Sequence, residues 1–163
     1  QFSELKKKFI YTLKNKKIRL FLAESITGGL LSSELIKIRG ASSYLDYSLV
    51  TYSDRSKEKI LQFKDEIKKY GLVSPQVAKT MVRNVRKFSD SKSLLSISCT
   101  GYASKNQDKN CIVGLVYIGI MYNDIIKIYN QKFNERNRAK IIQITAENMI
   151  KLSLNFIIEH CKE

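Results

Sequence analysis

The chain has 163 residues, with 29 Lys and Arg, 15 Asp and Glu and a single His, so its formal net charge is +14 at pH 7. A domain typically holds about 100–200 residues, and the 44% apolar content exceeds that of disordered chains. No apolar run reaches the roughly 18 residues that span a bilayer, and no secretory leader is visible. We expect one soluble domain over residues 1–163, located in the cytoplasm and without a membrane partner.

The first third of the chain has the pattern of an α/β unit. Apolar residues at helical spacing predict a helix over residues 3–14, and R-L-F-L-A-E predicts a strand over Arg19–Glu24. A turn with two glycines follows, within a helical pattern over residues 25–40 that begins with a hydroxyl side chain. The run D-Y-S-L-V-T-Y then predicts a second strand over residues 46–52.

The remainder of the chain continues this alternation and ends the strand series with a hairpin. A polar helix start is predicted at residues 53–57, and Ser74 followed by Pro75 predicts a helix over 75–88. Further elements are strands over 93–100, 112–122 and 125–133, with a hairpin turn between the last two, and a helix over 136–161. We therefore predict an α/β fold, a three-layer α/β/α architecture with a mixed β-sheet.

The single His restricts the chemistry that this chain can perform. His160 follows a long amphipathic segment, a position typical of a solvated helix end. Catalytic Ser-His-Asp or Cys-His sets and imidazole-rich zinc sites are disfavoured, and we expect no metal and no cofactor. Cys99, Cys111 and Cys161 form no C-x-x-C pair, which favours a reducing compartment. A hydrolase would need a Lys, Tyr or carboxylate base, and a thiol nucleophile at Cys111 remains an alternative.

The basic residues do not form one stripe. Short lysine runs at residues 6–8, 14–17 and 68–69 lie on several predicted elements. A nucleic-acid-binding protein is expected to gather its charge on one face, often with interleaved aromatic residues. Nucleic acid is therefore a disfavoured partner, and a nucleic-acid-associated basic protein is the third interpretation.

The turn at residues 24–29 stands where a predicted strand ends and a helix begins. Ligands of α/β proteins bind beyond the carboxyl ends of strands, and helix N-termini present unpaired N–H groups to anions. Gly28 and Gly29 permit close approach of the backbone, and the hydroxyls of Ser25 and Thr27 can cap the helix or contact a ligand. This motif alone leaves both interpretations open.

Six sequence blocks together resemble the CinA C-terminal domain family. They are A-E-S-I-T-G-G at 23–29, G-A-S-S-Y at 40–44, V-T-Y-S-D-R-S-K at 50–57, Y-G-L-V-S at 70–74, C-T-G at 99–101 and V-G-L-V-Y-I at 113–118. The resemblance runs from near Leu20 to the last helix. Active members of this family are nicotinamide mononucleotide deamidases, which use no metal and convert that nucleotide and water into nicotinic acid mononucleotide and ammonia.

The resemblance implies roles for individual residues. Ser25 matches the nucleophile, and Tyr52 and Lys57 match the groups that activate it, which agrees with the shortage of His. A Lys serves as a base only where burial or neighbouring cations lower its pKa. The expected substrate-binding residues are Thr27, Gly28, Gly29, Ser42, Thr100, Gly101 and either Arg136 or Arg138. Among them, the backbone at 27–29 or 100–101 is expected to stabilise an oxyanion.

The loop over residues 102–111 departs from the family pattern. Where the family has T-G-I-A-G-P and further glycines, this chain has T-G-Y-A-S-K-N-Q-D-K-N-C, so Ser104, Lys105 and Asn106 bring side chains to that space. The first interpretation is a serine amidohydrolase with a small-molecule nucleotide as its substrate. The second is a catalytically impaired member that binds a nucleotide or another phosphorylated ligand. A homo-oligomer is compatible with either.

Overall fold

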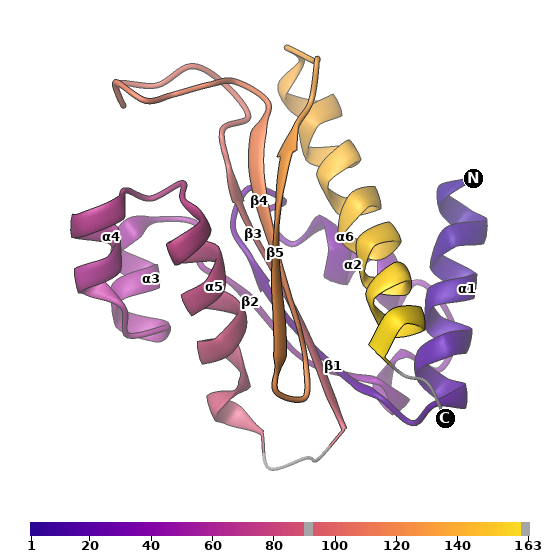
Figure 1. Cartoon of the computed structure of the whole chain (residues 1–163). Coiled ribbons are helices and arrows are strands. Elements are labelled where there is room, and N and C mark those ends of the chain that lie inside the picture. The colour runs from indigo at the N-terminus through magenta and orange to yellow at the C-terminus, as the bar shows by residue number, and fades with distance from the viewer. Residues whose placement is uncertain (90–92, 161–163) are drawn as a thin grey trace.

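The computed structural model describes residues 1–89 and 93–160, which fold around a five-stranded sheet, as Figure 1 illustrates. The strand order is β2-β1-β3-β4-β5. The strands are β1 (Arg19–Glu24), β2 (Leu45–Val50), β3 (Leu94–Gly101), β4 (Leu115–Tyr122) and β5 (Ile125–Lys132). β1 pairs in parallel with β2 and β3, whereas the β3–β4 and β4–β5 pairs are antiparallel. The predicted mixed sheet is confirmed.

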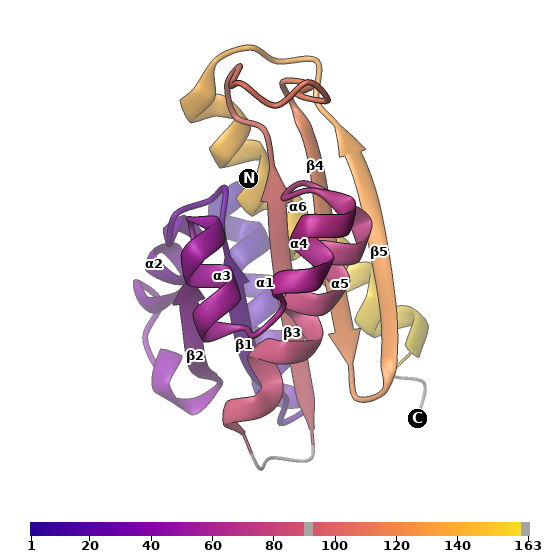
Figure 2. The same cartoon turned by 90° about the vertical axis from the view of Figure 1, so that its left-hand side faces the viewer.

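Helices cover both faces of the sheet (Figures 1 and 2). One face carries α1 (Phe2–Asn15), α2 (Leu30–Ile36) and α6 (Arg138–His160), and the other carries α3 (Asp54–Ile60), α4 (Lys64–Tyr70) and α5 (Pro75–Asn84). Short 3-10 helices occupy Ala41–Ser43 and Val85–Phe88. The three-layer α/β/α architecture predicted from the sequence is therefore confirmed.

The sheet divides the core into two parts. Leu20 and Leu22 of β1 face the larger cluster, which includes residues of α1 and α6, whereas Phe21 and Ala23 face a smaller cluster with Met81 of α5. Successive strand residues point to opposite faces, so a strand covered on both faces is apolar throughout. This explains the unbroken apolar run in β1 and fixes the position of the polar turn that follows it.

The last helix belongs to the core. By length and composition alone, α6 resembles a membrane-spanning helix, as buried core helices of other proteins also do. Its buried residues are Ile141, Thr145, Ala146, Met149, Ile150, Ser153, Leu154, Phe156 and Ile157. Many of these side chains pack in the larger cluster, so the apolar composition of α6 is accounted for by the fold.

Several predicted boundaries are wrong for local reasons. α2 begins at Leu30 because Gly28 and Gly29 have φ values of +59° and +98°, which end the strand in a turn before the helix starts. β4 begins at Leu115 because Gly114, at φ +90°, makes a turn instead of continuing a strand from residue 112. The sequence pattern did not separate α4 from α3, and the predicted helix end at Cys161 lies outside the described residues.

Candidate active site

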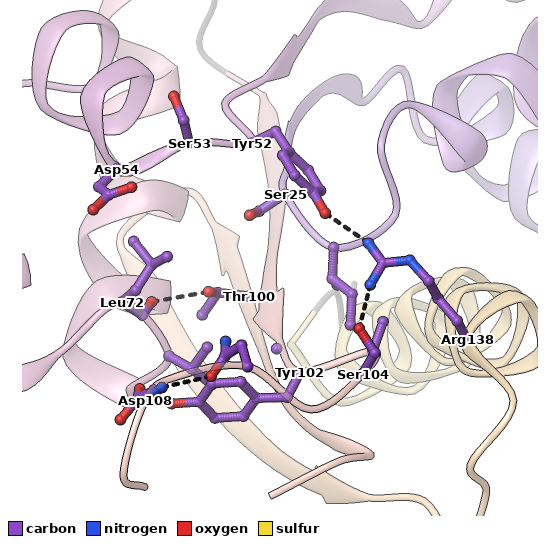
Figure 3. A pocket seen from close by; sticks show the side chains of 15 residues that line it. Ser25, Tyr52, Ser53, Asp54, Leu72, Thr100, Tyr102, Ser104, Asp108 and Arg138 are labelled. Carbon is purple, nitrogen blue, oxygen red and sulfur yellow. Dashed lines mark hydrogen bonds between the residues drawn. The ribbon is translucent and has the colours of Figure 1, made fainter. Parts of the chain in front are cut away.

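A cleft of about 500 Å³ lies at the carboxyl ends of the parallel strands (Figure 3). Open α/β sheets bind ligands in the crevice outside the carboxyl ends of their strands. The lining residues are Ser25, Ile26, Tyr52, Ser53, Asp54, Leu72, Val73, Thr100, Gly101, Tyr102, Ala103, Ser104, Asn106, Asp108 and Arg138. They come from the ends of β1, β2 and β3, from the starts of α3 and α6, from the segment between α4 and α5, and from the loop at 102–111.

Ser25 is the first residue after β1, and its side chain reaches the cleft. The Gly28 N–H donates to the Ser25 carbonyl at 3.0 Å, which closes a tight turn directly after the strand. The residue is only 6% exposed. A hydroxyl on a short turn between a buried strand and a helix is held rigidly, which is the condition for a positioned nucleophile.

A buried carboxylate holds this turn in place. Glu24 accepts hydrogen bonds from Thr27 Oγ1 at 2.7 Å, from the N–H groups of Leu31 and Ser32 at 3.0 Å each, and from Ser48 Oγ at 3.2 Å. Ser32 Oγ donates to it as well, at 2.7 Å. Glu24 thus ties the end of β1 to the first turn of α2 and to β2. Sequence reasoning missed this role, although the sequence shows an acidic residue where the predicted strand meets the predicted helix.

Lys57 reaches Ser25 from α3, the helix that follows β2. Its Nζ donates to Ser25 Oγ at 2.7 Å, to the Thr51 carbonyl at 2.6 Å and to the Tyr52 carbonyl at 3.0 Å. The side chain is fully buried, although Lys57 lies on the short polar helix α3, which begins at the N-cap Ser53. The helix directs the lysine back toward the end of β2 because only three residues separate it from that strand.

Burial lowers the pKa of Lys57 to about 8, from its ordinary value of 10.5. The nearby Cys99 and Asp54 act in the opposite direction with smaller effects. A neutral amine has two N–H donors and one lone pair, so it can donate to both carbonyls and accept the proton of Ser25 Oγ. A protonated amine can donate to all three partners. The same geometry therefore accommodates both charge states that a general base must adopt.

Tyr52 contacts this pair through its backbone and not through its hydroxyl. Its carbonyl accepts from Lys57, but its side chain is 56% exposed and its hydroxyl accepts from Arg138 Nη2 at 2.6 Å. Arg138 Nη1 donates to Ser104 Oγ at 2.7 Å. Of the two arginines that the sequence left open, Arg138 lines the cleft, whereas Arg136 lines a separate pocket.

The other expected substrate-binding residues divide into two groups. Thr100 and Gly101 line the cleft at the end of β3, where Thr100 Oγ1 donates to the Leu72 carbonyl at 2.9 Å. The remaining ones, Thr27, Gly28, Gly29 and Ser42, do not line it. Thr27 Oγ1 is bound to Glu24, and Ser42 precedes β2 at the opposite edge of the sheet, where its carbonyl faces Arg19 at 3.4 Å.

The loop at 102–111 keeps a defined shape without the glycines of the family pattern. The Tyr102 hydroxyl donates to the carboxylate of Asp108, which also accepts from the Asn110 N–H at 2.9 Å. These hydrogen bonds lower the pKa of Asp108, and burial raises the pKa of Tyr102. The Asp108 N–H donates in turn to Asn106 Oδ1 at 2.8 Å. Side-chain hydrogen bonds thus organise this wall of the cleft.

The alternative nucleophile and the single histidine lie elsewhere. Cys111 lines the separate pocket that contains Arg136, with its Sγ 3.6 Å from the Ser104 carbonyl. His160 lies at the end of α6, where its ring packs 4.4 Å from that of Phe156. Within residues 1–89 and 93–160, no group of three or more His, Cys, Asp or Glu side chains is placed to hold a metal ion.

Known proteins share this sequence pattern and this fold. The model of the CinA C-terminal domain family matches residues 2–157. A Finegoldia magna protein is 41% identical over 130 residues, covering 78% of this chain and 30% of the relative. A CinA-like protein of Prochlorococcus marinus is 38% identical over 152 residues, covering 91% of this chain and 35% of the relative. The chain thus spans about a third of the length of the curated relatives it matches.

Solved structures agree with the fold. The competence damage-inducible protein A of Klebsiella pneumoniae superposes with a TM-score of 0.91 at 20% identity, and the match covers 99% of both chains. At this identity the similarity establishes the fold alone. The family match over residues 2–157 is the stronger finding. Because this match covers nearly the whole chain, the chain belongs to the CinA C-terminal domain family.

Proposed function

We propose that this chain is a metal-independent amidohydrolase that converts nicotinamide mononucleotide and water into nicotinic acid mononucleotide and ammonia. The observation that carries the proposal is the 2.7 Å hydrogen bond between Lys57 Nζ and Ser25 Oγ in a buried site. A serine amidase without a histidine needs another base, and burial brings the pKa of Lys57 near the working range of a general base. The substrate class itself comes from the family resemblance.

In the proposed reaction, neutral Lys57 takes the proton of Ser25 as Oγ attacks the carboxamide carbon. The tetrahedral intermediate collapses when Lys57 returns this proton to the leaving nitrogen, which departs as ammonia and leaves an ester on Ser25. Lys57 then takes a proton from water, whose oxygen attacks the ester carbon. Protonated Lys57 returns the proton to Ser25 Oγ as the acid product leaves, so one base serves both half-reactions.

The N–H of Gly101 is our proposed oxyanion donor. The Tyr102 N–H is bound to the Leu115 carbonyl, and neighbouring residues of an antiparallel ladder point to alternate sides, so the Gly101 N–H faces away from β4. That side of β3 is the one on which β1 ends at Glu24. The Gly28 N–H, in contrast, is bound within the turn. One such donor contributes roughly 3–4 kcal/mol to transition-state stabilisation in studied enzymes.

Ammonia release from nicotinamide mononucleotide tests the proposal. We expect the wild type to form ammonia and nicotinic acid mononucleotide in equal amounts, and Ser25→Ala to lower the rate by at least about a thousandfold. Ser33→Ala removes an exposed hydroxyl of α2 and serves as the matched control. A wild type that releases no ammonia would contradict the proposal, and so would a Ser25→Ala variant that keeps its activity.

The loop at 102–111 supports the second candidate, a family member that binds a phosphorylated ligand without turnover. Ser104 and Asn106 bring side chains into the cleft. The family pattern has a glycine at the position of Ser104 and further glycines beyond it. A thermal shift with nicotinamide mononucleotide and no ammonia release would favour this candidate. Retention on heparin at about 0.2 M salt would instead favour a nucleic-acid partner.

A further inference from the structure

Asp108 places a carboxylate in the wall of the cleft, in the loop where this chain departs from the family pattern (Figure 3). The Tyr102 hydroxyl donates to this carboxylate, and so does the Asn110 N–H, at 2.9 Å. The hydrogen bond from Tyr102 and then that from Asn110 lower the pKa of Asp108, so the group is ionised at neutral pH. Neither donor is charged. Asp108 therefore presents a held negative charge to a ligand in the cleft.

This negative charge has no cation as its partner within residues 1–89 and 93–160, where the ion pairs join other residues. The second carboxylate of the cleft, that of Asp54, is different. It stands in the first turn of α3, where the helix dipole favours an acid, and its charge opposes the effect of burial on the pKa of Lys57. Asp108 is thus the carboxylate of the cleft whose charge is left for a ligand.

An aromatic side chain stands next to this carboxylate. Tyr102 lines the cleft, and its hydroxyl is the group that holds Asp108. An aromatic ring and a carboxylate are each favourable neighbours for a cation. Leu72 and Val73 add apolar side chains to the same cleft. A flat, apolar ligand ring that carries a positive charge therefore suits these surroundings better than a neutral ring does.

We infer that Asp108, held by Tyr102, makes the cleft select ligands whose aromatic ring is a cation, namely a pyridinium ring substituted on nitrogen. In the proposed reaction the carboxamide lies between Ser25 Oγ and the Gly101 N–H, and Tyr102 directly follows Gly101 in the chain. The ring that bears the carboxamide then lies in the part of the cleft that Tyr102 lines. The choice of nucleotide rests on the proposed function, whereas the preference for a positive ring rests on the charge of Asp108.

The reduced form of nicotinamide mononucleotide is a matched probe for this preference. Its dihydropyridine ring is neutral, but it keeps the carboxamide, the ribose and the phosphate. The binding of both forms is measured by calorimetry on Ser25→Ala, which lacks the proposed nucleophile and so does not consume the ligand. A charge pair near a protein surface is worth up to about fivefold in affinity, and we expect the oxidised form to bind about fivefold more tightly than the reduced form.

Asp108→Asn, added to Ser25→Ala, removes the charge and keeps an oxygen that accepts from Tyr102. It should bring the affinities for the two forms to within about twofold of each other. Asp124→Asn removes an exposed carboxylate at the turn between β4 and β5, so it is the matched control and should keep the preference. Equal affinities in Ser25→Ala would overturn the inference, as would binding of neither form or a preference that Asp108→Asn leaves unchanged.

Tyr102→Phe tests whether the hydroxyl positions the carboxylate. The ring stays in the wall of the cleft, while Asp108 loses the donor that holds it. We expect the affinity for the oxidised form to fall and that for the reduced form to stay the same, because a neutral ring gains little from the charge. Equal weakening of both forms would show that Tyr102 acts through the shape of the loop, and would overturn its part in the inference.

Turnover separates this inference from the proposed function. If Ser25→Ala prefers the oxidised form and Asp108→Asn abolishes this preference, but the wild type releases no ammonia, the proposed function fails and the charge selection stands. If the wild type hydrolyses nicotinamide mononucleotide but Asp108→Asn changes neither its KM nor the preference between the two forms, the charge selection fails and the proposed function stands.

Discussion

Replacing Lys57 by Met is expected to change how the stability of the protein depends on pH. Burial lowers the pKa of Lys57 from 10.5 to about 8. At about 1.4 kcal/mol per pKa unit, this difference corresponds to about 3 kcal/mol of folding free energy. The unfolded chain binds the lysine proton more tightly than the folded chain does. Folding must therefore release this proton between pH 8 and 10.5, and the wild type becomes more stable as the pH rises through that window.

Urea unfolding at several pH values measures this effect. The free energy of unfolding of the wild type, minus that of Lys57→Met, is expected to rise by about 2.5 kcal/mol between pH 7 and pH 10. Groups common to both proteins cancel in this difference. Lys59→Met replaces an exposed lysine on the same helix and corrects for the loss of one positive charge. Parallel stability curves for the wild type and Lys57→Met would refute the claim that Lys57 is desolvated by the fold.

Two further substitutions test the buried hydrogen bonds and the close packing that support the site. Glu24→Ala leaves buried donors of the 25–32 segment without an acceptor. We therefore expect it to lower the free energy of unfolding, measured in urea, by about 3 kcal/mol. A loss below about 0.5 kcal/mol would contradict the role of Glu24. Gly119→Ala places a Cβ 2.5 Å from Ser98 Oγ and 2.9 Å from the Ala78 carbonyl oxygen. We expect it to cost about 1–3 kcal/mol, measured as a lower melting temperature, whereas an unchanged melting temperature would show that β4 and α5 separate easily.

The fold was predictable because its signals are local. β1 and β3 are continuous apolar runs, as expected of strands buried on both faces, and Pro75 marks the start of α5. The short helix α4 escaped notice because it buries none of its residues fully and so lacks a clear apolar face. The start of β4 was placed too early because the apolar pattern continues through the turn at Gly114.

The site was predictable only in part because its contacts join distant residues. The sequence blocks pointed to Ser25 and Lys57, but their hydrogen bond spans 32 residues and the burial of a lysine on a polar helix leaves no local signal. The contact between Arg138 and Tyr52 spans 86 residues. Ser104 was noticed only as a departure from a glycine pattern, and its partner became evident once the start of α6 was placed beside the loop.

The pH dependence of kcat/KM for ammonia release from nicotinamide mononucleotide tests the central claim most directly, namely that neutral Lys57 is the base for Ser25. Between pH 7 and pH 10, the substrate phosphate no longer titrates, so the profile reports the free enzyme. The account predicts that kcat/KM rises with pH and levels off above an apparent pKa of about 8. A profile that stays flat or falls across this range would contradict it.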